Sequence, residues 1–185
     1  MPQYIAFLRG INVGGHRVKM DRLREIFAEL GLKDVSTFIA SGNVAFSTDS
    51  DDRDGLRELI EDYLASQLGY EVPTFIRTPA ELAAIVSFNP PGTVTQTPSV
   101  ASHYVIFLDT RAPHSLRSAL TQLNSEVDHF HFSDAEIHWL IRGKLTESPL
   151  FGQPELDRAT RGVRTTMRNM NTLRRIASKT DPAEA

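Results

Sequence analysis

Apolar residues recur along the chain with the two spacings of a mixed helix and strand protein. Short apolar runs, typical of strands, are separated by longer segments in which apolar residues return every three or four positions, as on one face of a helix. We expect the first strand over residues 4–8 and the first helix over residues 21–30, with Leu23, Ile26 and Phe27 on its apolar face. The pattern predicts an α+β fold.

The first half of the chain is predicted to follow the order β-α-β-β-α-β, which is typical of the ferredoxin-like fold. After the first strand and helix, we expect strands over residues 35–40 and 44–47, a helix with an apolar stripe from Leu56 to Leu68, and a strand over residues 74–77. Another helix is then expected to start, with Thr78 as its N-cap and Pro79, whose φ angle is fixed, at the first helical position.

The second half repeats β-α-β-β, with strands expected over residues 103–108, 127–132 and 136–142 and a helix over 113–123. A short helix near residues 149–157 and a helix from about 170 to 178 complete it. We therefore predict two ferredoxin-like β-α-β-β-type halves, an internal structural duplication, with a C-terminal helical segment. The predicted divisions are a first half (1–88), a linker (89–102), a second half whose C-terminal helix packs back on the first (103–180) and a disordered tail (181–185).

Composition narrows the class of protein. The chain is 41% hydrophobic and 23% charged, which is ordinary for a globular protein. It has no cysteine, which excludes disulfides and thiolate metal sites and is compatible with a reducing cytosol. No apolar run approaches the ~20 residues of a membrane-spanning helix, and the N-terminus does not resemble a signal peptide. We expect a cytoplasmic protein without a membrane partner, and composition leaves its oligomeric state open.

A glycine-rich loop connects the first strand to the first helix, and it reads Leu8-Arg9-Gly10-Ile11-Asn12-Val13-Gly14-Gly15. Glycines before a helix start let backbone amides approach an anion, Arg9 donates to a carboxylate or phosphate in bidentate fashion, and Lys19 adds charge near the helix N-terminus. The spacing is neither Walker A nor G-x-G-x-x-G. The candidate ligand-binding residues are Arg9, Gly10, Asn12, Gly14, Gly15 and Lys19. Alternatively, the glycines only permit a wide turn and Arg9 is buried against an acidic residue.

A second candidate is the tight turn Ser41-Gly42-Asn43 between two predicted strands. Because the first and third strands are neighbours in this topology, the turn is expected near Arg9 and Gly10. Ser41 and Asn43 then either help to bind the ligand or tie down the loop. Turn geometry alone accounts for the Gly and Asn.

A basic segment near the C-terminus is the third candidate. Residues 158–179 contain seven Lys/Arg and no acidic residue, whereas the rest of the chain has 13 Lys/Arg against 23 Asp/Glu. Asn169 and Asn171 are good helix N-caps, and Arg164 and Arg168 precede the helix, so together they suit a phosphate-sized anion. The two arginines alternatively pair with the acidic remainder. We predict that the segment folds back so that a set of polar residues converges: Arg9, Asn12, Lys19, Arg168 and Asn169.

The three motifs resemble those of the domain-of-unknown-function 1697 family. They are residues 4–15, residues 41–44 (Ser-Gly-Asn-Val) and residues 166–172 (Thr-Met-Arg-Asn-Met-Asn-Thr), in this order and spanning nearly the whole chain. The resemblance implies an α+β fold of two related halves in a soluble bacterial protein. It implies no established activity.

Metal sites and catalytic groups are not indicated. Hairpin geometry places His131 opposite His138, with His129 on the same face and the apolar residues Phe130, Phe132, Ile137 and Trp139 on the other. Because no carboxylate has an evident ligand spacing, we expect this histidine face to be solvated and to hold no metal. The acidic loop at residues 50–61 departs from a calcium loop at Ser50. No nucleophile–base pair is evident, so the catalytic residues are unknown and no cofactor is expected.

The function that fits these observations is binding of a small anionic ligand, bearing a phosphate or carboxylate, by the glycine-rich loop and the C-terminal Arg/Asn motif. Enzymatic activity is left open. One alternative is a single-stranded nucleic-acid-binding protein, but such sheets stack bases on several aromatic residues, and here only Phe46 is offered because Phe7 is expected in the core. The other alternative is a structural or interaction module.

Overall fold

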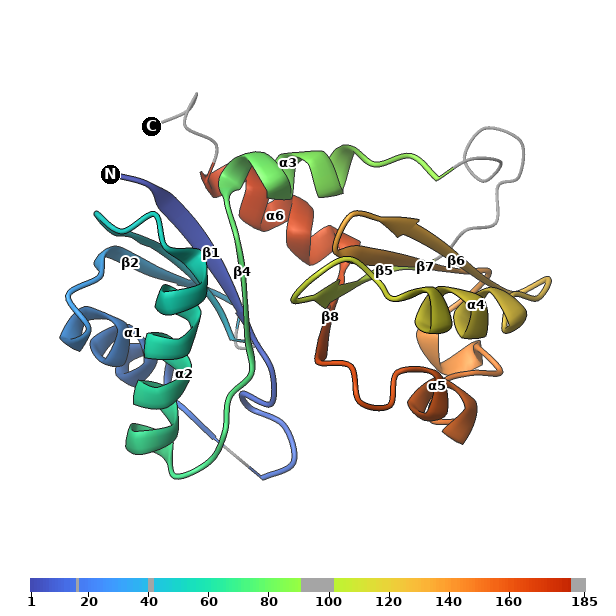
Figure 1. Cartoon of the computed structure of the whole chain (residues 1–185), viewed down its shortest axis with the longest axis horizontal. Coiled ribbons are helices and arrows are strands. Elements are labelled where there is room, and N and C mark those ends of the chain that lie inside the picture. Colours follow the sequence, from blue (N-terminus) through green and yellow to red (C-terminus); the bar gives the residue numbers. More distant parts are fainter. Residues whose placement is uncertain (16, 40–41, 91–101, 181–185) are drawn as a thin grey trace. The chain divides into compact units, whose positions relative to one another are not determined.

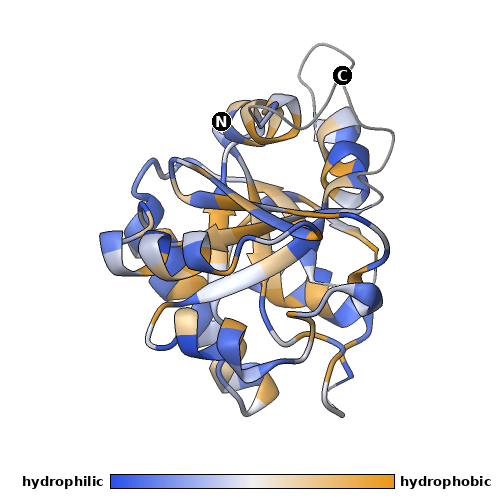
Figure 2. Cartoon of the chain, turned by 90° about the vertical axis from the view of Figure 1, so that its right-hand side faces the viewer, coloured by the Kyte–Doolittle hydropathy of each residue, from blue (hydrophilic) through white to orange (hydrophobic). Residues whose placement is uncertain are grey.

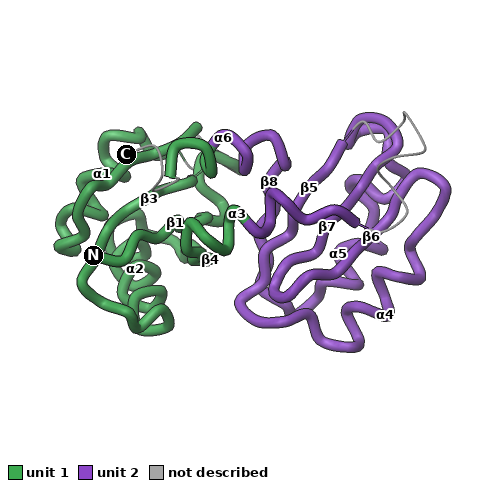
Figure 3. Tube along the Cα trace, turned by 90° about the horizontal axis from the view of Figure 1, so that it is seen from above, with its two compact units in different colours: residues 1–83, 176–185 green, residues 84–175 purple. Residues whose placement is uncertain are grey.

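The computed structural model describes residues 1–15, 17–39, 42–90 and 102–180 (Figure 1). The chain divides into two compact units, coloured separately in Figure 3. Unit 1 comprises residues 1–83 and the end of the chain from Ile176, and unit 2 comprises residues 84–175. The predicted linker lies mostly, and the predicted tail wholly, outside the described residues.

Unit 1 contains one four-stranded sheet in the order β2-β3-β1-β4, and every neighbouring pair is antiparallel. Its elements occur in the order expected from the sequence, and β2 begins two residues earlier than predicted. They are β1 (Gln3–Leu8), α1 (Met20–Glu29), β2 (Lys33–Phe38), β3 (Asn43–Ser47), α2 (Arg53–Leu68), β4 (Thr74–Arg77) and the beginning of α3 (Pro79–Ser87).

The core of unit 1 lies between this sheet and helices α1 and α2. Alternate residues of β1 point to opposite faces, so Tyr4, Ala6 and Leu8 enter the core together. The helices contribute apolar residues at helical spacing, including those that the sequence predicts: Leu23, Ile26, Phe27, Leu56, Ile60 and Leu64. The opposite face of β1 is buried as well, since Ile5 and Phe7 have no exposed surface.

Unit 2 contains a second four-stranded antiparallel sheet in the order β6-β7-β5-β8. Its elements are the end of α3, β5 (Ser102–Leu108), α4 (His114–Gln122), β6 (Asp128–Ser133), β7 (Glu136–Ile141), the 3-10 turn η1 (Leu145–Glu147), α5 (Pro154–Ala159), β8 (Thr165–Asn169) and most of the first two turns of α6 (Met170–Thr180). Two expectations need correction. The short helix begins at Pro154, not near Pro149, and part of the basic segment forms strand β8.

The two sheets have equivalent strand order and register. Leu8 pairs with Thr74 where β1 meets β4, and Leu108 pairs with Thr165 where β5 meets β8. In each half a helix follows the last strand directly, and its first turn is capped. Thr78 Oγ1 accepts from the Glu81 amide at 3.1 Å, and Asn169 Oδ1 accepts from the Asn171 amide at 2.8 Å. The molecule is thus an α+β protein with two similar sheet-containing halves.

A buried polar group lies beside the core of unit 2. Trp139 packs in this core, and its ring stacks on Phe130 at a centroid distance of 5.5 Å. The indole Nε1 donates to Asp128 Oδ1 at 2.8 Å, and Ser148 Oγ donates to the same oxygen at 2.7 Å. Asp128 therefore connects β6, β7 and the turn after η1.

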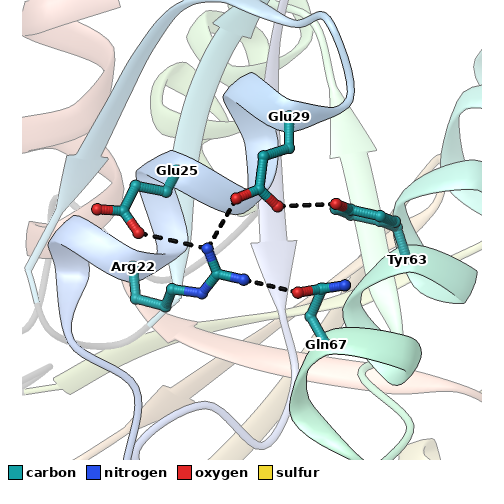
Figure 4. Close-up of polar contacts among 5 residues, drawn as sticks. All are labelled: Arg22, Glu25, Glu29, Tyr63 and Gln67. Carbon is teal, nitrogen blue, oxygen red and sulfur yellow. Dashed lines mark hydrogen bonds and ion pairs between the residues drawn. The ribbon is translucent and has the colours of Figure 1, made fainter.

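Figure 2 shows hydrophobic and hydrophilic residues interspersed along the helices. On the hydrophilic surface of unit 1, Arg22 and Glu29 of α1 join Tyr63 and Gln67 of α2 (Figure 4). Arg22 donates to Glu29 at 2.8 Å and to Gln67 at 2.6 Å, and the Tyr63 hydroxyl donates to Glu29 at 2.7 Å. No helix in the described part of the chain has the length and apolar content needed to cross a membrane.

Candidate anion-binding site

The glycine-rich loop runs from the end of β1 to the start of α1, and its backbone repeatedly adopts left-handed angles. The φ angle is +81° at Gly10, +62° at Gly14 and +93° at Gly15, and Asn12 also has a positive value of 59°. A Cβ atom at any of these three glycines would meet nothing within 4 Å. Glycine is therefore favoured at these positions because of the positive φ angle, since a side chain there would not clash with neighbouring atoms. The space beside the glycines is open.

A side-chain hydrogen bond of Asn12 stabilises this loop. The side-chain Oδ1 accepts a hydrogen bond from the Val18 amide at 2.8 Å, across six residues. Because Asn tolerates left-handed angles better than most residues, it combines the local turn with this closing contact. Asn12 thus has an architectural role, whatever the loop binds.

Three cationic side chains lie exposed on the loop: Arg9, Arg17 and Lys19. Among the described residues, none of the three takes part in an ion pair. The alternative in which Arg9 is buried against a carboxylate is therefore wrong. Arg17 is not among the ligand-binding residues predicted from the sequence, although its place two residues before Lys19 in the same loop indicates such a role.

Helix α1 begins at this loop without a side-chain cap. Lys19 is the N-cap residue, and its side chain makes no capping hydrogen bond. The acidic residue of the first turn, Asp21, pairs with Arg24 one turn further along the helix. The N-terminal amides of α1 thus combine with the cations of the loop to make an electropositive region.

The β2–β3 turn lies against the glycine-rich loop, as predicted from the topology. Gly42 carbonyl oxygen accepts from the Leu8 amide at 2.8 Å, and a Cβ at Gly42 would lie 3.0 Å from the Cβ atoms of Leu8 and Ile11. Asn43 is fully buried and donates from Nδ2 to the Phe38 carbonyl at 3.0 Å. This contact closes the β2–β3 turn itself, so the choice between ligand binding and tying down the glycine-rich loop stays a prediction for Asn43. Ser41 lies outside the described residues.

The C-terminal candidates belong to unit 2 and have partners there. Arg168 is buried on β8 and donates from Nη1 to Thr166 Oγ1 and to the Met167 carbonyl, both at 2.9 Å. Burial lowers the pKa of Arg168 to about 10. Arg164 pairs with Asp109 at 3.2 Å, and Asn169 caps α6. The predicted convergence of these residues with Arg9, Asn12 and Lys19 stays a prediction.

The histidine hairpin differs from its expected surroundings. The register is as predicted, since His131 lies opposite His138. However, the face is only partly solvated, because His138 has no exposed surface whereas His129 and His131 are partly exposed. Sequence alone does not reveal that this second face of the sheet is covered. Within the described ranges, no three His, Asp or Glu side chains are grouped so as to hold a metal ion.

Comparison with known proteins supports the fold. The family described as "Protein of unknown function (DUF1697)" matches residues 1–138. A solved structure, "The structure of conserved bacterial protein SP0830 from Streptococcus pneumoniae", is similar with a TM-score of 0.73 and 23% sequence identity, over 97% of this chain and 98% of that chain. At this identity the likeness concerns the fold alone. No curated protein matches the chain.

Proposed function

The chain belongs to the DUF1697 family, and we propose that it binds a small anionic ligand, bearing a phosphate or carboxylate, at the glycine-rich loop of unit 1. The observation that carries the proposal is the exposure of Arg9, Arg17 and Lys19 on one loop, with no ion-pair partner in the described part of the structure. Like charges on one loop repel each other, and a bound anion would reduce that repulsion.

The backbone of the loop suits the same ligand. Gly10, Gly14 and Gly15 leave space through which an anion can reach the peptide N–H groups. The α1 amides after Lys19 lack a side-chain cap, and helix N-termini favour negative charge. Guanidinium and ammonium groups beside such amides form charge-assisted hydrogen bonds with phosphate or carboxylate oxygens.

In its wider form the proposal adds the C-terminal motif, with Arg164, Arg168 and Asn169, to the same site. Its support is electrostatic, because an Arg168 with a pKa of about 10 is still charged at neutral pH. Arg164 and Asn169 already have partners in unit 2, so the glycine-rich loop supplies most of the binding.

Two further assignments belong to this proposal. We assign both halves to the ferredoxin-like fold, and the support is the matching strand orders β2-β3-β1-β4 and β6-β7-β5-β8 with antiparallel neighbours. We also place the protein in the cytoplasm, in keeping with a chain that contains no cysteine.

Single-stranded nucleic acid is a less suitable ligand. Base stacking needs exposed aromatic rings on the sheet, and Phe7 and Phe46 are both fully buried. The charge of the whole chain is −3, which does not favour a polyanion.

The test is an NMR titration of ¹⁵N-labelled protein with inorganic pyrophosphate and, separately, with citrate. We expect saturable shifts of the amides of residues 10–15 and 20–22. Arg9→Ala and Lys19→Ala should each weaken binding about tenfold, which corresponds to about 1.4 kcal/mol. Arg111→Ala is the matched control, since Arg111 is exposed on the loop that follows the equivalent strand β5. Unchanged affinity in Arg9→Ala would overturn the proposal.

Oligothymidylate provides the comparison with the nucleic-acid alternative. The nucleic-acid alternative would be favoured if the logarithm of the binding constant falls steeply and linearly with the logarithm of the salt concentration. Such a slope reports the release of several counterions. If no compound shifts the loop amides and the substitutions change only the melting temperature, the loop is architectural and the chain is a structural or interaction module.

A further inference from the structure

Unit 2 holds a cluster of histidines, of which His138 is fully buried and His103 and His131 are partly buried, on the face of its sheet opposite the Trp139 core. His103 Nε2 and His138 Nδ1 form a hydrogen bond at 2.9 Å between β5 and β7. His131 lies directly opposite His138 on β6. The cluster therefore crosses three neighbouring strands, and every member is an imidazole that can take up a proton.

An aromatic ring closes this cluster. Phe88, the residue after α3, stacks on His138 with centroids 4.3 Å apart and ring planes inclined by 32°. His138 has no exposed surface, and its Nε2 has no hydrogen-bond partner among the described residues. His131 Nε2 is likewise buried without one. A neutral imidazole tolerates such surroundings far better than a charged one.

The charged groups around the cluster are mostly positive. The face contains Arg168 of β8 and Glu136 of β7, since register places both on the same side as His138, and Arg174 of α6 acts on His103. Burial, then His103 and His131, lowers the pKa of His138 to about 3. Burial, then Arg174 and His131, lowers the pKa of His103 to about 4.

We propose that this cluster is an acid-sensitive latch, in which protonation of the His103–His138 pair releases Phe88 and the C-terminal end of α3 from the β5–β8 sheet. A proton added to His138 creates a buried charge. In the doubly protonated ring both nitrogens are donors, and Nε2 has no acceptor among the described residues. Opening exposes the imidazolium to water and removes both costs.

The direction of the pH dependence follows from linkage. In the open form the histidines titrate near ~6.5, whereas in the closed form they take up protons only near 4 and 3. The open form therefore binds more protons below about pH 6.5, and acid favours it. At about pH 5, each histidine that is protonated only in the open form shifts the equilibrium toward the open form by roughly 30-fold.

The experiment compares amide hydrogen exchange at Phe88, whose N–H bonds to the Ile85 carbonyl at 3.3 Å, with exchange in the β5–β7 core. After correction for the intrinsic rate, we expect protection of Phe88 to fall at least tenfold between about pH 7 and pH 5, while core protection falls less. His138→Leu should abolish this local loss. His129→Gln, on the same face of β6 but outside the hydrogen-bonded pair, is the matched control and should retain it.

A second variant keeps the test independent of whether His138→Leu folds. Phe88→Ala opens the cluster to water, so the pKa of His138, followed by the imidazole Cε1–H signal, should rise toward its ordinary value. An unchanged pKa in Phe88→Ala would overturn the latch. So would a wild-type protection of Phe88 that stays constant across this pH range.

Discussion

Arg77 and Arg168 occupy equivalent positions in the two halves of the chain. Arg77 pairs with Ile5 on β1, and Arg168 pairs with Val105 on β5. Each lies one residue before a helix cap, and each donates from Nη1 to the carbonyl of the preceding residue at 2.9 Å. Both are buried, with 5% and 8% of their surface exposed. A buried guanidinium thus occupies the same position, at the end of the last strand of the sheet, in both halves.

The repeated arginine predicts that lysine is a poor substitute at either position. Arg77→Lys and Arg168→Lys should each lower the free energy of unfolding by about 1–2 kcal/mol, because an ammonium cannot reproduce the planar set of donors. Urea denaturation measures the change. Arg161→Lys, at an exposed position of unit 2, is the control and should have no effect. Full stability of both buried variants would show that only the charge matters there.

Gly42→Ala should disrupt the contact between the β2–β3 turn and the glycine-rich loop. The residue has a φ angle of +69°, and the new Cβ would lie 3.0 Å from the Cβ atoms of Leu8 and Ile11. We expect a loss of about 2–3 kcal/mol from backbone strain and overcrowding together. Gly69→Ala separates the two causes, since Gly69 has a similar φ of +78° and open space around it, so it should cost about 1 kcal/mol. Equal losses in both variants would mean that crowding contributes nothing.

Asp128→Ala should destabilise unit 2 more than the loss of one surface charge does. The substitution leaves the buried Trp139 Nε1–H and the Ser148 hydroxyl without their acceptor. Unsatisfied buried donors of this kind cost about 1–3 kcal/mol each. Thermal unfolding followed by circular dichroism should show a clear fall in Tm. Ser148→Ala removes the donor to Asp128 and the acceptor of the Leu150 amide but keeps the Trp139 bond, so it should produce a smaller fall. The reverse ranking would contradict this role of Asp128.

Tyr63→Phe should raise the pKa of Glu29. In the wild type that pKa is lowered by the hydrogen bond from Tyr63 and then by the one from Arg22. Removing the hydroxyl removes the first of these effects, so protonation of Glu29 becomes easier. An NMR titration of the Glu29 carboxyl carbon measures the shift. Gln67→Ala is the control, because Gln67 contacts Arg22 and not Glu29, and it should change this pKa less.

The amphipathic segments were predictable because local pattern and tertiary packing agree in them. The apolar stripe of α1, including Phe27, is the stripe that enters the core. The capping residues Thr78 and Asn169 were also identified, since a cap depends on residues only a few positions apart. The close approach of the β2–β3 turn to the glycine-rich loop followed from strand order.

Strand β8 was not predictable from its own residues. Thr165–Asn169 has two polar residues, Thr166 and Arg168, at the positions that become buried, so its alternation looks like that of an exposed loop. Pairing with β5 determines its structure, and this pairing is remote in sequence. The prediction of a solvated histidine face was wrong at His138 for a related reason. The register of His131 and His138 is local, whereas the Phe88 ring that packs on His138 comes from about 50 residues earlier in the chain.

The candidate site was predicted only where it is local. Arg9 and Lys19 lie on one loop, and their exposure agrees with a binding role. The charge of Arg168 predicts a binding role, but charge gives no information about burial, and this residue is nearly enclosed. The same limit explains why the Asp109 partner of Arg164 was not foreseen.

The single tryptophan of the chain, Trp139, lies in the core of unit 2. Its emission therefore reports the melting of one half, whereas far-ultraviolet circular dichroism averages over the helices and strands of both. Superimposable curves from the two signals would mean that the duplicated halves melt as one cooperative body. Different midpoints would mean that each half unfolds in its own transition, and their order would show which half is more stable.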